Sequence, residues 1–348
     1  MTKATEPSRR TFIEGTAATA AMLIIGAKDG AASTFHTMLA EHPSFAKHDP
    51  GPFNVERPAR MRAIDEALGN RIFESLIRRE APLRDDIEQA ILRAHSRDYY
   101  HRVRKAGLDT AHLPYDFDGD TVMSVATWEA ALRAVGAGLM AVDAVMDTTS
   151  DVDNAFCQVR PPGHHAESGR AMGFCFFSNV AISALYARAR HGAERVAVVD
   201  FDVHHGNGTQ SIFWSDKNLF YGSTHEMPLF PGTGAVSETG VGNIFNAPLK
   251  AGDDGAVFRQ AMSERILPAL DAFRPDLILI SAGFDAHEGD PLGHIRLLEA
   301  DFVWITQQIM DIAARRCSGR IVSMLEGGYE LGALGRSVAA HVTALMNL

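Results

Sequence analysis

The segment RVAVVDFDVHHGNG, Arg195–Gly208, joins an apolar run to a cluster of titratable side chains. The apolar half predicts a buried strand that ends at Asp200. The polar half places Asp200, Asp202, His204 and His205 within six residues of one another. Buried charges are costly unless they are paired or bind a metal. The segment is therefore either a solvated loop that follows a strand or a functional site.

Strand geometry divides these polar residues into two sets. Successive side chains of an extended segment alternate, so Asp200, Asp202 and His204 share one face and His205 lies on the other. Asp202 and His204 can thus offer a carboxylate oxygen and a ring nitrogen to one metal ion. A mixed oxygen and nitrogen set suits zinc or another transition metal better than calcium or magnesium. We predict a structural role for His205.

Short β-rich runs alternate with amphipathic segments along the rest of the chain. The expected strands are Phe35–Ala40, Ala155–Arg160, Arg195–Asp200, Leu219–Ser223, Leu277–Ser281 and Arg320–Leu325. The expected helices are Thr127–Met146, Ser178–Arg190, Gly255–Phe273, Ala300–Ala314 and Leu334–Met346. Ser178 is expected as an N-cap, and Gly192 lies just past the end of its helix. This alternation predicts a single α/β domain with a mostly parallel sheet that helices cover on both faces.

Other expected strands also end in unusual polar chemistry. PPGHHAES follows the strand that ends at Arg160, AGFDAHEGDP follows the strand that ends at Ser281, and EGGYE follows the last strand. Ligands of open α/β sheets bind beyond the carboxyl ends of the strands. These clusters and the opening segment should therefore meet at one edge of the sheet. Asp285, in the second of them, is the candidate for a third metal ligand, and three protein ligands would leave a position for water.

Composition narrows the class of protein. The chain has 348 residues and a formal net charge of −10, which argues against a nucleic-acid-binding surface. Its three cysteines are too few and too scattered for a disulfide framework or a thiolate zinc site. No segment is long and apolar enough to be expected to cross a membrane. These features predict a globular protein that binds no nucleic acid and spans no membrane. They do not decide between a monomer and a homo-oligomer.

The N-terminus differs in character from the rest. SRRTFIEGTAATAAMLIIGA places Arg9 and Arg10 before a short apolar, alanine-rich stretch and then small residues. This order is typical of a twin-arginine export signal. Residues 1–32 are therefore interpreted as such a signal, which predicts a periplasmic protein, or alternatively as a disordered extension of a cytoplasmic one. Residues 33–348 are interpreted as one catalytic domain.

Six ordered motifs carry a family resemblance: RPPGHHAE, GFCFFSNVAI, VDFDVHHGNGTQ, FPGTG, SAGFDAHEGDPLG and EGGY. They resemble the zinc-dependent histone deacetylase and acetylpolyamine amidohydrolase superfamily, especially its bacterial, class II-like amidohydrolases. The resemblance runs from about Met38 to the C-terminus. It implies a three-layer α/β/α domain with a sheet of about eight strands. It also implies an amidohydrolase that removes acetyl or other acyl groups from lysine or related amines.

The resemblance implies roles for individual residues around one catalytic zinc ion. Asp202, His204 and Asp285 would bind the zinc. His165 would act as the general base and acid, a task that suits a histidine near neutral pH. Asn207 would be the hydrogen-bonding partner of His165.

The remaining implied roles concern charge, substrate and a second ion. His164 would be an electrostatic neighbour oriented by Asp200, and Tyr329 would donate a hydrogen bond to the developing oxyanion. The substrate-binding residues that the resemblance implies are Gly173, Phe174, Phe230 and Leu292. In some relatives a monovalent cation is held at positions that match Asp200 and Ser223, so a structural potassium ion is expected there.

Substrate preference is less constrained than the chemistry. Leu292 follows GDP at a position where a polyamine-specific branch has glutamate, so acyl-lysine substrates are expected in preference to acetylpolyamines. An arginase-like ureohydrolase would need a further Asp-x-Asp near Asp285 and would lack Tyr329. A non-catalytic acyl-lysine-binding protein would be expected to have lost His165 or Tyr329. The histidines expected on the surface without a function are His42, His48 and His191.

Overall fold

The computed structural model of the protein describes residues 35–348, so the expected export signal over residues 1–32 lies outside the described residues. The strands of the main sheet are β1 (Thr37–Glu41), β2 (Ile77–Glu80), β5 (Asn154–Cys157), β6 (Val196–Asp200), β7 (Leu219–Glu226), β8 (Ile244–Leu249), β9 (Leu277–Ala282) and β10 (Ile321–Leu325). A small hairpin is formed by β3 (Tyr115–Asp116) and β4 (Val122–Met123).

Helices occupy most of the intervening chain. The α-helices are α1 (Ala59–Ala67), α2 (Ile87–Ile91), α3 (Arg97–Leu108), α4 (Thr127–Met146), α5 (Asn179–His191), α6 (Asn207–Phe213), α7 (Gly255–Ala261), α8 (Leu267–Phe273), α9 (Glu299–Arg316) and α10 (Leu331–Leu345). Short 3₁₀ turns are η1 (Pro43–Ala46), η2 (Arg71–Phe73) and η3 (Thr110–His112), and η4 (Met262–Ile266) is a π-helical turn. Within residues 35–348, no helix has the length and apolar character needed to span a membrane.

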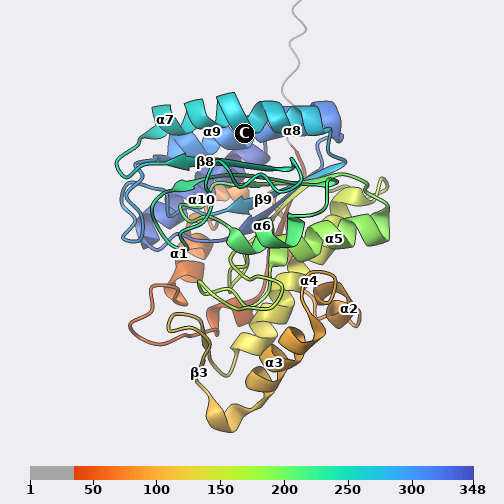
Figure 1. Ribbon diagram of the computed structural model, residues 1–348. Helices are drawn as coiled ribbons and strands as arrows, with labels where there is room; N and C mark the ends of the chain where they lie inside the picture. The colour runs from red at the N-terminus through yellow and green to blue at the C-terminus, as the bar shows by residue number, and fades with distance from the viewer. Residues whose placement is uncertain (1–34) are drawn as a thin grey trace, which may run out of the picture. The chain divides into compact units, whose positions relative to one another are not determined.

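The main sheet has eight strands in the order β2-β1-β5-β10-β9-β6-β7-β8, and every neighbouring pair is parallel. The expected three-layer α/β/α fold is therefore confirmed. Helices α1, α9 and α10 pack together on one face, and α4 and α5 pack together on the other (Figure 1). The central strands β5, β6, β9 and β10 are buried along their whole length, as expected of parallel strands covered on both faces.

Strand order brings the polar loops together. Strands β5, β10, β9 and β6 are consecutive in the sheet, although β9 and β10 come last in the chain. Each of these strands leads into one of the polar clusters identified in the sequence. Because parallel strands end at the same edge, all four loops meet at the carboxyl edge of the sheet centre. The topology therefore creates a site from segments that are far apart in the sequence.

Several element boundaries differ from the predictions. The segment 255–273 is not one regular helix, because the π-turn η4 separates α7 from α8. The edge strands β2 and β8 were not predicted, and β5 ends at Cys157 rather than Arg160. The α5 boundaries are close to the prediction, with Gly192 in the left-handed conformation (φ 69°), but the Ser178 side chain makes no capping hydrogen bond.

Candidate active site

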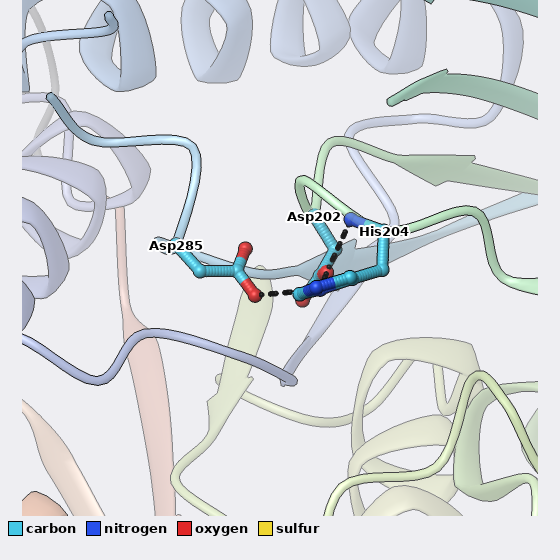
Figure 2. A group of neighbouring side chains, drawn as sticks. All are labelled: Asp202, His204 and Asp285. Atoms are coloured by element: carbon cyan, nitrogen blue, oxygen red, sulfur yellow. Dashed lines mark hydrogen bonds and ion pairs between the residues drawn. The ribbon is translucent and has the colours of Figure 1, made fainter. Parts of the chain in front are cut away.

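Asp202, His204 and Asp285 lie at the carboxyl edge with ligand atoms within 4.8 Å of one another. Asp202 and His204 come from the loop after β6, and Asp285 reaches them from the loop after β9 (Figure 2). Nδ1 of His204 lies 3.2 Å from Oδ1 of Asp202 and 3.2 Å from Oδ2 of Asp285. Among residues 35–348, this is the only group of three such side chains close enough to share a metal ion.

Backbone contacts hold both carboxylates in place. The amide of Val203 donates to Oδ1 of Asp285 at 2.8 Å, and the amide of Gly327 donates to Oδ2 of Asp202 at 2.8 Å. A side chain at Gly327 would collide with the carboxylates of Asp285 and Asp202, and one at Gly283 would collide with Asp202. Glycine is therefore required at both positions so that the backbone can approach the ligands.

The electrostatics of this group fit a divalent cation. Both carboxylates are almost fully buried, with Asp202 at 1% and Asp285 at 0% exposure. Burial, and then the neighbouring carboxylate of Asp202, raise the pKa of Asp285 to about 7. Two buried carboxylates this close repel each other unless a cation lies between them. One nitrogen and two carboxylate oxygens are also ligands that zinc accepts.

Asp200 organises the residues behind this group. Its Oδ2 lies 3.0 Å from Nδ1 of His164 and accepts a hydrogen bond from the Tyr221 hydroxyl, also at 3.0 Å. Its Oδ1 accepts the amide of Asp202 at 3.1 Å. Burial alone would lower the pKa of His164, but the carboxylates of Asp202 and Asp200 outweigh it and raise the pKa to about 10. These carboxylates therefore favour the protonated form of His164, next to Asp202.

The pKa of the neighbouring His165 is shifted in the opposite direction. Its Nδ1 lies 2.9 Å from Oδ1 of Asn207, and its ring centroid is 4.0 Å from that of His164. Burial, followed by the positive charges of His164 and His204, holds the pKa of His165 well below its usual value. A neutral imidazole can accept a proton, which is the state that a general base needs.

Tyr329 faces the same space from the loop after β10. Its side chain is 6% exposed, and burial raises the pKa of its phenol well above the usual value. Its backbone amide donates to Oδ2 of Asp290 at 2.6 Å. The Arg60 guanidinium lies 4.9 Å from the ring centroid. The phenol is thus a protonated hydrogen-bond donor on a firmly held ring.

A pocket of about 660 Å³ opens above these groups. His165, His204 and Tyr329 line it, together with all four expected substrate residues: Gly173, Phe174, Phe230 and Leu292. Phe230 packs edge-to-face on His165 at 5.0 Å, and Phe174 packs in the same way against Tyr329 at 5.8 Å. Gly173 is left-handed (φ 56°) and abuts the His165 ring so closely that a Cβ would overlap it. The pocket therefore joins apolar walls to a polar floor.

Ser223, His205 and His48 complete the placement of the predicted residues. Ser223 lies directly opposite Asp200 across the β6–β7 ladder, and its hydroxyl is 2.9 Å from Nδ1 of His225. His205 contacts Thr233 and Gln210 through its two ring nitrogens at 2.7 and 3.0 Å. The prediction that His48 lies on the surface was wrong, because it is 1% exposed.

Comparison with known proteins decides the family. The model of the histone deacetylase domain matches residues 54–345. The chain belongs to the histone deacetylase family. The histone deacetylase-like amidohydrolase of Pseudomonas aeruginosa is 38% identical over 292 residues, which cover 82% of this chain and 74% of that protein. Chloroplastic histone deacetylase 10 of Oryza sativa is 38% identical over 315 residues, covering 88% of this chain and 70% of its own.

A solved structure agrees with this assignment. The crystal structure of the HDA15 HD domain matches with a TM-score of 0.83 at 34% sequence identity, covering 90% of this chain and 89% of that one. Sequence, topology and fold thus place the protein among deacetylases, which are hydrolases of amide bonds.

Sequence reasoning missed a group of buried charged residues that contacts the loop carrying Tyr329. Arg60, on α1, donates from Nε to the Gly328 carbonyl at 2.7 Å and from Nη1 to Oε1 of Glu56 at 2.9 Å. Glu56 also accepts from Arg160 and lies 3.3 Å from Nε2 of His48. The signal was present in NVERPARMR, which places Glu56 and Arg60 four positions apart, the spacing of an ion pair along a helix.

Proposed function

We propose that this protein is a zinc-dependent amidohydrolase that removes acetyl or other acyl groups from acylated lysine or related amines. The observation that carries the proposal is the common floor of one apolar-walled pocket, where His165, His204 and Tyr329 converge. The apolar walls, which include Phe174 and Phe230, suit the methylene chain of an acyl-lysine side chain. The polar floor suits the amide at its end.

Asp202, His204 and Asp285 would hold the zinc ion. When bound, zinc polarises an amide carbonyl and lowers the pKa of water. A structural potassium ion held by Asp200 and Ser223 is a further part of the proposal.

The chain's own residues would move the protons. Neutral His165 accepts a proton from the attacking water and later returns it to the departing amine. The cationic His164, held by Asp200, stabilises negative charge that develops nearby. Tyr329 donates its phenolic hydrogen to the developing oxyanion, and such preorganised donors contribute strongly to catalysis.

The structure favours this chemistry over a two-metal ureohydrolase. The second carboxylate available near Asp285 belongs to Asp290, which accepts the backbone amides of Tyr329 and Glu330 at 2.6 and 3.1 Å. Those bonds commit Asp290 to holding the tyrosine loop. A non-catalytic acyl-lysine-binding role would give no reason to keep a tyrosine donor and a histidine pair against the metal ligands.

The preference for acyl-lysine over acetylpolyamines rests on Leu292. Its apolar side chain lines the pocket, and it offers no charge to a second ammonium group. An acetylpolyamine deacetylase is the alternative. Selectivity that strongly favoured acetylspermidine or acetylputrescine over an acetyl-lysine peptide would contradict the role given to Leu292.

A substrate panel tests the proposal. Zinc-loaded enzyme would be assayed on acetyl-lysine peptides, acetylpolyamines and small acyl-amides, with Asp285→Ala and Tyr329→Phe variants in parallel. We expect turnover of acyl-lysine substrates that both substitutions strongly reduce. Full activity in both variants would overturn the assignment of the site.

Export by the twin-arginine route is also proposed for residues 1–32. Replacing Arg9 and Arg10 with lysine should retain the protein in the cytoplasm if this segment directs transport. Cell fractionation of the two forms would measure the difference. Cytoplasmic location of the unchanged form would contradict export and support the alternative of a cytoplasmic protein with an N-terminal extension.

A further inference from the structure

The side-chain amide of Asn207 bridges two groups. Its Oδ1 lies 2.9 Å from Nδ1 of His165, and its Nδ2 donates to Oε1 of Glu167 at 2.8 Å. We propose that Glu167 is a positioning residue for the reaction, because it fixes the orientation of the Asn207 amide and thereby the tautomer of His165. This inference rests on the deacylase function proposed above.

The chain of hydrogen bonds has one consistent direction. An ionised carboxylate only accepts hydrogen bonds, so Glu167 must face the NH₂ group of Asn207. The amide oxygen then faces His165, and Nδ1 of His165 must carry the proton that this oxygen accepts. In a neutral imidazole the other nitrogen, Nε2, is then an acceptor. That is the nitrogen which a general base needs free toward the pocket.

A flipped amide would reverse this arrangement. The NH₂ group of Asn207 would face Nδ1 of His165, and it would favour the tautomer with its proton on Nε2. Such a histidine cannot take a proton from water at that nitrogen. An amide has no intrinsic preference between the two orientations, so its partners decide. The remaining partner on this side, the sulfur of Met172 at 3.3 Å, is a weak acceptor.

The position of Glu167 does not depend on its carboxylate. Its amide donates to the Arg170 carbonyl at 3.0 Å, and its carbonyl lies 2.9 Å from Nδ1 of His95. The side chain borders a surface groove of about 370 Å³ that also contains Ser215 and Trp214. Substitutions at residue 167 should therefore leave the loop in place.

Two substitutions separate hydrogen bonding from structure. Glu167→Leu removes the acceptor and should lower kcat by roughly 10- to 100-fold with KM within about twofold, as expected for a lost bond to a charged group. Glu167→Gln keeps an acceptor oxygen and should restore kcat to within about threefold of the unchanged enzyme. Ser215→Leu places the same side chain in the same groove without removing a hydrogen bond of the Asn207 side chain, and it should leave kcat unchanged.

In an Asn207→Asp variant, the effect of Glu167→Gln on kcat should be reversed. Asn207→Asp has no amide to flip, but it sets two carboxylates at hydrogen-bonding distance, where like charges repel. Adding Glu167→Gln supplies an NH₂ donor to the new carboxylate. The double variant should therefore have a higher kcat than Asn207→Asp alone, whereas Glu167→Gln does not raise kcat in the unchanged enzyme. A simple packing role of Glu167 would not produce this reversal.

The tautomer of His165 can be measured directly, without an activity assay. Nitrogen NMR of zinc-loaded protein with ¹⁵N-labelled histidine, assigned with a His165→Gln variant, should show neutral His165 with its proton on Nδ1 in the unchanged protein. In Glu167→Leu, a substantial fraction should instead carry the proton on Nε2. If this change of tautomer is observed but no acyl-amine is turned over, the role of Glu167 is supported and the proposed activity is rejected. Unchanged kcat and tautomer in Glu167→Leu, or no gain in the double variant, would overturn the inference.

Discussion

Replacing Gly173 with alanine should remove most of the activity and leave the protein folded. A Cβ at this position would lie 2.9 Å from Cγ of His165, closer still to Cδ2, and 3.0 Å from Cε1 of Phe230. Carbon atoms pack at about 3.5–4.0 Å, so the imidazole must move by roughly 1 Å. The ring has little room to move, because His164 packs against it at 4.0 Å and Asn207 is hydrogen bonded to it.

The magnitude follows from this displacement. A misplacement of about 1 Å in a catalytic group lowers rates by roughly 100-fold, which corresponds to about 2.7 kcal/mol of activation free energy. The left-handed backbone of Gly173 (φ 56°) adds a separate cost in stability, about 1–2 kcal/mol for a non-glycine residue. The loss should therefore appear mainly in kcat and only modestly in the free energy of unfolding.

Gly192→Ala is the matched control. Gly192 has a similar backbone (φ 69°), but a Cβ there would meet nothing within 4 Å. It should therefore lose only the backbone cost of about 1–2 kcal/mol and keep full kcat. Deacylation kinetics on an acetyl-lysine peptide and urea unfolding would be measured for both variants. Unchanged kcat in Gly173→Ala, or an equal loss of kcat in Gly192→Ala, would refute the argument from the close approach to His165.

Three further outcomes are expected. Tyr329→Phe should lower kcat by about 10²–10³-fold with little change in KM, since it removes one oxyanion donor; steady-state kinetics would test this. Chelation should abolish turnover. The metal-free protein should lose stability as pH rises from about 4 to about 7. Because the folded state raises the pKa of Asp285 to about 7, its carboxyl group stays protonated in this range only when the protein is folded. Thermal melts across this range should show that added zinc removes the pH dependence. Glu56→Ala leaves two buried arginines without their carboxylate and should lower the free energy of unfolding by about 3–5 kcal/mol in urea titrations.

Periodicity predicted the sheet centre because those strands are apolar on both faces. The edge strands gave no such signal. β2 has the sequence IRRE and is largely exposed, and β8 contains Pro248, a residue confined to edges or bulges. The π-turn at Met262–Ile266 is also invisible to a pattern count, because its residues keep helical spacing on both sides.

The residues around the metal group could be predicted because they follow strands in short, dense clusters. Supporting residues could not, since their contacts are long-range. His48 has no local sequence feature that predicts burial; it is buried because Thr127 and Glu56 contact its ring at 2.7 and 3.3 Å. Arg60 reaches the Gly328 carbonyl across 268 positions of the chain. Only the assembled fold brings such partners together.

The position of β10 in the middle of the sheet has a consequence for biosynthesis. Strand β10 lies between β5 and β9, and the loop that follows it supplies the Gly327 amide bound to Asp202, 125 positions earlier in the chain. A nascent chain that has emerged from the ribosome through the loop after β9 contains Asp202, His204 and Asp285, but its sheet still has an empty central place. We therefore expect a chain cut short between residues 285 and 321 to contain all three candidate ligands but to lack the strand and the Gly327 amide that hold them together.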